Sequence, residues 1–125
     1  MGLIKIDGEV ADVRRPARTV AVRQMLVDTG SEFTWVPEDL LRKIGVRVAK
    51  KDLVFVMANG ATISRSTGYA ILRASGFETV DEVVFGQPGD LTLLGARTLE
   101  GFGATIDPRG KRLAAAGPHL AAPVP

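Results

Sequence analysis

The sequence predicts an all-β domain, a small closed antiparallel β-barrel that forms a single lobe and carries one or two short helices. Short runs rich in Val, Ile, Leu and Phe recur along the chain, and Gly, Pro, Asn and Asp separate them. This pattern is typical of strands joined by tight turns. With 125 residues, of which 46% are hydrophobic, the chain is long enough for one hydrophobic core. We therefore expect one folded domain.

The first half of the chain predicts three strands and a short helix. Apolar and polar residues alternate over residues 4–7 and 20–23, as they do in half-buried strands. The apolar run 25–27 ends abruptly at Asp28, which predicts a strand followed by a loop. A helix is predicted from Pro37 onward, because acidic residues follow the proline, basic residues come next, and a glycine ends the segment.

The second half predicts two hairpins, three further strands and a second helix. Asn59-Gly60 lies between the strand-like runs 53–57 and 62–64, which is a strong hairpin signal. Further strands are expected over residues 69–73, 80–85 and 91–94, a helix over 96–102, and a hairpin that joins 104–106 to 111–113. Beyond this point Ala, Pro and Gly dominate. We thus expect a domain over residues 1–113 and a flexible tail over 114–125.

Composition argues against several classes of function. The chain has 16 basic and 14 acidic residues, and no aromatic residues interleave with the basic clusters, so nucleic-acid binding is not expected. It contains no cysteine, which excludes disulfides and thiolate metal sites. The chemistry inferred below needs neither a metal nor a cofactor. The absence of a leader-like start and of a long apolar run predicts a cytoplasmic protein without membrane attachment.

The segment Asp28-Thr29-Gly30-Ser31 has the residue types of a catalytic loop. Gly30 permits a tight loop, which holds the preceding carboxylate in a defined direction. If two such carboxylates lie close together, they share one proton, so one acts as a base and the other as an acid on a water molecule. The alternative interpretation is an ordinary turn at the end of a strand, since Asp, Thr and Gly are all turn residues.

Residues 26–31 resemble the active-site loop of aspartic proteases, and residues 35–37 are similar to the stretch that follows this loop in the pepsin family. Downstream, Leu93-Leu94-Gly95 resembles the hydrophobic-hydrophobic-Gly motif that packs behind the loop. Pepsin-like enzymes carry two such loops, whereas this chain carries one. The closer resemblance is therefore to the retroviral-type, retropepsin-like aspartic proteases and their bacterial relatives, which are homodimers with an acid-protease-type barrel.

The resemblance implies roles for particular residues. Asp28 matches the catalytic aspartate, Thr29 the residue that interlocks the two loops of a dimer, Gly30 a residue whose backbone lines the cleft, and Ser31 the small polar residue beside the carboxylate. The hairpin over residues 54–66 takes the place of the flap that closes over a peptide, with its tip at Asn59 and Gly60. Apolar pocket residues are expected at Val36, Phe55, Ile63 and Leu93.

These observations predict an aspartic endopeptidase in which paired Asp28 carboxylates of two subunits activate water to cleave a peptide or protein substrate. The alternative is a homodimer of the same fold that binds a peptide or partner without cleaving it. One departure from the family pattern is Ala96, which stands where the viral enzymes have Arg; Arg97 is one place later. For Trp35, core packing is the preferred interpretation over a pocket role.

Overall fold

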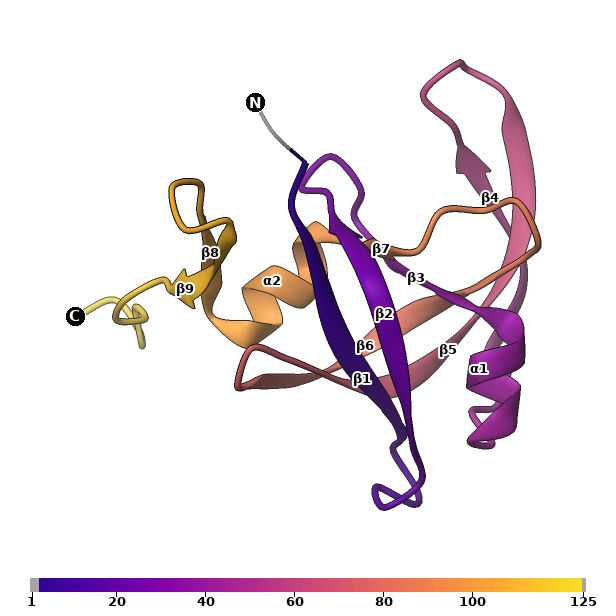
Figure 1. Cartoon of the computed structure of the whole chain (residues 1–125), viewed down its shortest axis with the longest axis horizontal. Helices are drawn as coiled ribbons and strands as arrows, with labels where there is room; N and C mark the ends of the chain where they lie inside the picture. Colours follow the sequence, from indigo (N-terminus) through magenta and orange to yellow (C-terminus); the bar gives the residue numbers. More distant parts are fainter. Residues whose placement is uncertain (1–2, 125) are drawn as a thin grey trace.

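The computed structural model describes residues 3–124, which form a mostly β arrangement with two short helices (Figure 1). The strands are β1 (Lys5–Asp12), β2 (Thr19–Val27), β3 (Thr34–Pro37), β4 (Lys50–Val56), β5 (Thr62–Ala74), β6 (Phe77–Gly86), β7 (Leu93–Leu94), β8 (Ala104–Asp107) and β9 (Arg112–Ala115). The helices are α1 (Glu38–Lys43) and α2 (Ala96–Phe102). The predicted mostly β class with few short helices is confirmed.

The main sheet has seven strands in the order β1-β2-β7-β3-β6-β5-β4, and β1 also pairs with β5. Most neighbours are antiparallel, but β2 with β7 and β3 with β6 are parallel. This differs from the expected antiparallel sheet. The reason is that these partners are far apart in sequence, so no hairpin fixes their relative direction. The short strand β7 thereby lies between β2 and β3, the two strands that flank the loop of Asp28.

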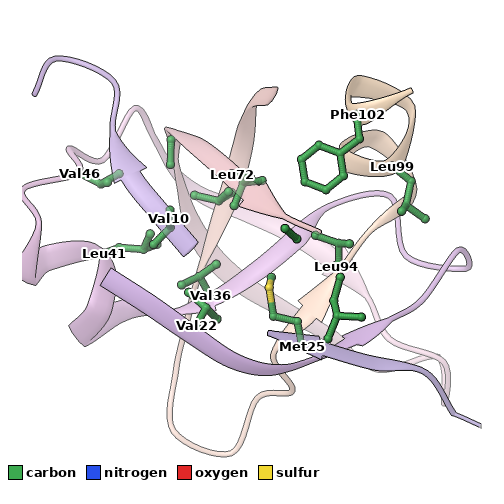
Figure 2. Packing of buried hydrophobic residues seen from close by; sticks show 14 of the residues in the cluster. Val10, Val22, Met25, Val36, Leu41, Val46, Leu72, Leu94, Leu99 and Phe102 are labelled. Carbon is green, nitrogen blue, oxygen red and sulfur yellow. The ribbon is translucent and has the colours of Figure 1, made fainter. Parts of the chain in front are cut away.

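The hydrophobic core fills the space enclosed by the curved sheet and the two helices. Figure 2 shows its central side chains, which come from five strands, from both helices and from the segment after α1: Val10, Val22, Met25, Val36, Leu41, Val46, Leu72, Leu94, Leu99 and Phe102. All ten are less than a tenth exposed, and Val10, Val36 and Leu41 are fully buried. Burial on this scale contributes about 1.5–3 kcal/mol for each large side chain. The core therefore fixes the strands that carry the functional loops.

Several predicted elements lie where the sequence placed them. Helix α2 spans Ala96–Phe102 as predicted, and Gly103 ends it in the left-handed conformation with φ of 66°. The hairpin of β8 and β9 is also confirmed, and it forms a separate two-stranded sheet beside α2 (Figure 1). Strand β9 reaches Ala115, beyond the expected domain boundary at residue 113.

Other elements differ from the prediction. The runs 62–64 and 69–73 belong to one long strand, β5, while only Leu93–Leu94 of the predicted strand 91–94 is in the sheet. Strand β3 was not predicted. Within residues 3–124, no helix is long and apolar enough to cross a membrane.

Candidate active site

The loop of Asp28 begins where β2 ends, and backbone hydrogen bonds hold it. The Asp28 N–H donates to the carbonyl oxygen of Leu94 at 3.0 Å, and the Ser31 N–H donates to the Asp28 carbonyl oxygen at 3.2 Å. The Gly30 N–H donates to Oδ1 of the Asp28 carboxylate at 2.9 Å. The carboxylate is half-buried. Its orientation is therefore set by the loop itself, before any ligand binds.

The start of α2 supports the same loop from behind. The N–H groups of Ala96 and Arg97 donate to the carbonyl oxygens of Ser31 and Glu32, at 2.7 and 3.1 Å. Gly95 packs so closely against the chain that a Cβ at this position would lie 2.3 Å from the carbonyl oxygen of Phe33. Only glycine fits there without displacing backbone. The hydrophobic-hydrophobic-Gly segment is thus in direct contact with the catalytic-type loop.

A buried chain of hydrogen bonds joins β3, α2 and β6 beneath this contact. The Gly95 N–H donates to Thr34 Oγ1 at 3.0 Å, the Thr34 and Thr98 hydroxyls are 2.5 Å apart, and the Thr98 hydroxyl donates to Asp81 Oδ2 at 2.9 Å. Both threonines are fully buried. Sequence reasoning missed Thr34, Thr98 and Asp81 as supports of the site, because they are distant in sequence and lie in no recognisable motif.

A cleft of about 700 Å³ lies between the Asp28 loop and the β4 side of the β4–β5 hairpin. Asp28, Gly30 and Ser31 line one side, and residues 53–58 line the other. Three aromatic rings form its base: Phe55 makes edge-to-face contacts with Phe33 and Trp35, with ring centroids 5.4 and 5.1 Å apart. The cleft is thus a largely apolar groove with the Asp28 carboxylate among its lining groups.

The expected pocket residues are only partly brought together. Phe55 and Leu93 line the cleft. Val36 lies in the core with no exposed surface (Figure 2). Successive side chains of a strand point to opposite faces, so Val36 and Trp35 lie on different faces of β3. Ile63 pairs with Phe55 across the hairpin but does not line the cleft. Trp35 is only 6% exposed, as expected for core packing, and it also lines the cleft. Both the packing role and the pocket role considered for this residue therefore apply.

The β4–β5 hairpin extends away from the rest of the sheet at the upper right of Figure 1. Its turn has three residues: Gly60 N–H donates to the Met57 carbonyl oxygen at 2.9 Å, and Met57 N–H donates to the Ala61 carbonyl oxygen at 2.8 Å. Gly60 has φ of 85°, and the Asn59 side chain accepts the Ala61 N–H at 3.0 Å. Asn59 and Gly60 are exposed at the tip, outside the cleft as it stands.

An ion pair ties the base of this hairpin to the loop between β6 and β7. Arg65 donates from Nε and from a terminal nitrogen to the two carboxylate oxygens of Asp90, at 2.7 and 2.9 Å. Both side chains are mostly buried, at 18% and 13% exposure. The hydrogen bonds from Arg65 lower the pKa of Asp90, and the Gln87 N–H on the same carboxylate acts in the same direction. Asp90 also lines the cleft, so this pair joins the hairpin to the cleft wall.

Because the pKa of Asp90 is lower in the folded than in the unfolded chain, the stabilisation by this carboxylate is complete above about pH 4 and is lost as the pH falls through the folded value. We expect Asp90→Asn to lower the free energy of unfolding by about 1–2 kcal/mol at pH 7. Thermal unfolding measured from pH 7 to pH 2 should show this difference shrink in acid. The exposed pair of Arg73 and Glu78 provides the control. Glu78→Gln should change stability by less than about 0.5 kcal/mol, and an equal effect of both variants would contradict the prediction.

The fold and the loop with its oriented carboxylate can be compared with those of known proteins. The chain matches a family model described as "Aspartyl protease" over residues 6–98, which is most of its length. It therefore belongs to the aspartyl protease family. No curated protein matches the sequence.

Among solved structures, the chain is similar to the retroviral protease-like domain of Ddi1 from Leishmania major. The two share 15% sequence identity with a TM-score of 0.56, over 92% of this chain and 89% of that one. At this identity the likeness bears on the fold, which is retropepsin-like. The predicted family is thus confirmed.

Proposed function

We propose that this protein is an aspartic endopeptidase whose active site forms when two copies bring their Asp28 carboxylates together. The observation that carries the proposal is the single, backbone-held Asp28 carboxylate in a peptide-sized groove. One carboxylate of this kind provides a base or an acid, whereas peptide hydrolysis needs both. The 125 residues contain one Asp-Thr-Gly segment, so in this proposal the second carboxylate comes from another copy of the chain.

In the proposed reaction the Asp28 pair holds one proton and one negative charge, with a water molecule between the carboxyl groups. The ionised Asp28 removes a proton from the water molecule, and the water oxygen attacks the scissile carbonyl carbon. The protonated Asp28 donates to the carbonyl oxygen, which gives a tetrahedral diol. The now ionised Asp28 then removes a proton from one hydroxyl of the diol, the Asp28 protonated in the first step donates its proton to the amide nitrogen, and the C–N bond breaks. The products are a carboxylic acid and an amine, and the pair regains its starting state.

The position of Thr29 supports the paired arrangement. It is exposed next to Asp28, and it contributes to a second hollow formed with α2 and β8 rather than to the cleft. A second copy related by a two-fold axis would place its own Thr29 against this side of the loop. The β4–β5 hairpin would then act as a flap: its exposed tip at Asn59 and Gly60 would close over a bound peptide and exclude water.

The dimer requirement predicts that activity depends on protein concentration. Below the dissociation constant of the dimer, the rate of peptide cleavage should rise with the square of the total protein concentration, so that doubling the protein gives about a fourfold rate. The measurement is cleavage of a quenched fluorescent peptide library over a dilution series, with analytical ultracentrifugation on the same samples.

An excess of Asp28→Asn protein should also suppress the wild type, because mixed dimers have one carboxylate. If specific activity stays constant in samples that are entirely monomeric, the shared site is wrong. If dimers bind peptides but cleave none of them, the protein is a peptide-binding homodimer rather than an enzyme.

A further inference from the structure

The charged groups that line the cleft are all acidic. They are Asp28, Glu32 and Asp90, and among the described lining residues there is no Lys or Arg. This contrasts with the whole chain, which carries a formal net charge of +2. The negative character of the groove is therefore a local feature of the site and does not follow from an acidic composition.

The three acids differ in how they are neutralised. The charge of Asp90 is paired with Arg65 at 2.7 Å, and Asp28 belongs to the proposed catalytic pair. Glu32 is exposed, and over residues 3–124 its carboxylate makes no ion pair within 4.0 Å and no side-chain hydrogen bond. Its carboxylate is thus the one acid of the groove with neither a counter-ion nor a catalytic assignment.

Arg97, whose backbone contacts that of Glu32, is a candidate counter-ion, but its side chain is directed elsewhere. Its backbone N–H binds the Glu32 carbonyl oxygen, but its guanidinium group lies over the ring of Phe33, 4.8 Å from the centroid, and 3.9 Å from Asp81. Arg97 therefore neutralises the buried end of the hydrogen-bond chain. The Glu32 carboxylate remains available to a cation that enters the groove.

The surroundings of Glu32 suit a long basic side chain. Phe33, the next residue in the chain, and exposed Leu91 line the same cleft as Glu32, so the cleft offers apolar surface for the methylene stem of Lys or Arg while the charged end reaches the carboxylate. A neutral or acidic side chain at this place would leave Glu32 unpaired or repelled. In a two-fold dimer, one Glu32 would lie on each side of the Asp28 pair.

We propose that Glu32 is a specificity-determining residue that selects peptides with Lys or Arg close to the scissile bond. This inference rests on the proposed function and names its substrate class. An exposed charge pair contributes modestly, so wild-type kcat/KM should be about 2- to 5-fold higher for a peptide with Lys than for the same peptide with Gln, and the value for the peptide with Glu should be lower than both. The preference should weaken at high ionic strength.

The test compares wild type, Glu32→Gln, Glu32→Lys and the control Glu78→Gln on peptides that differ only in Lys, Gln or Glu at successive positions around one apolar cleavage site. Glu32→Gln should bring the Lys-to-Gln ratio close to 1. Glu32→Lys should reverse the order, and Glu78→Gln should keep it. Glu78 is an exposed acid on β6 that does not line the cleft.

Two results would overturn the proposal: a basic preference that survives in Glu32→Gln, or an equal loss for all peptides together with a weaker dimer, which would make Glu32 a subunit contact. If wild type cleaves no peptide at all, the proposed protease function is wrong, but the role of Glu32 can still be tested. The test then uses the dissociation constants of the same peptides. The order Lys, Gln, Glu in affinity, lost in Glu32→Gln, supports a cation-selecting groove, and equal affinities reject it.

Discussion

Asp28→Asn is expected to lower kcat/KM for peptide cleavage by on the order of 10³-fold or more, while the folded structure is kept. The amide cannot remove a proton from water and cannot share a proton with a second carboxyl group, so both halves of the acid–base chemistry are lost. Its Oδ1 still accepts the Gly30 N–H that holds the loop. The melting temperature should therefore stay within about 2 °C of wild type, because only one charge changes at a half-buried position.

A matched control is Asp7→Asn. The Asp7 carboxylate is exposed on β1 and accepts a backbone N–H, that of Gln24, at 2.9 Å, so the substitution makes the same chemical change away from the cleft. Cleavage by this variant should equal that of wild type. If Asp28→Asn cleaved at more than about a tenth of the wild-type rate, Asp28 would not be the catalytic acid or base, and the proposed mechanism would have to be abandoned.

The parts of the site that the sequence predicted are those encoded by a few consecutive residues. The Asp28 loop, the Asn59-Gly60 hairpin and helix α2 each depend on local turn chemistry, capping or strand ends, and local signals of this kind are legible in one sequence. For Asn59-Gly60 the presence of the hairpin was predicted. Its three-residue turn was not, because the same dipeptide fits more than one turn type.

The parts that were not predicted depend on pairings between distant segments. Strand β3 has four residues and takes its conformation from β6 and β7 on either side of it. The placement of Val36 in the core and Trp35 toward the cleft follows from the register of β3, and a shift of one residue would exchange them. The contact of Thr34, Thr98 and Asp81 likewise exists only once β3, α2 and β6 have met.

The same dependence on distant contacts makes Gly95 a position where a small change should damage both the fold and the site. Gly95→Ala is expected to lower the free energy of unfolding by about 3 kcal/mol or more, and cleavage activity should fall at least tenfold. The added methyl group would lie 2.3 Å from the Phe33 carbonyl oxygen and 2.8 Å from that of Glu32. Backbone cannot rotate away as a side chain does, so the Asp28 loop and the start of α2 must separate.

Urea unfolding of Gly95→Ala and Gly86→Ala measures this effect against a graded control. Gly86 is also buried and also faces a carbonyl oxygen, that of Val36, but the added Cβ would be 3.2 Å away, so a shift of a few tenths of an ångström relieves it. The cost at Gly86 should stay below about 1.5 kcal/mol. If both variants unfolded at the same urea concentration, the distance from the added Cβ to the carbonyl oxygen would not determine the loss of stability, and the prediction would be wrong. A larger loss at Gly95 would mean that the Asp28 carboxylate owes its position to a contact 67 residues away in the chain.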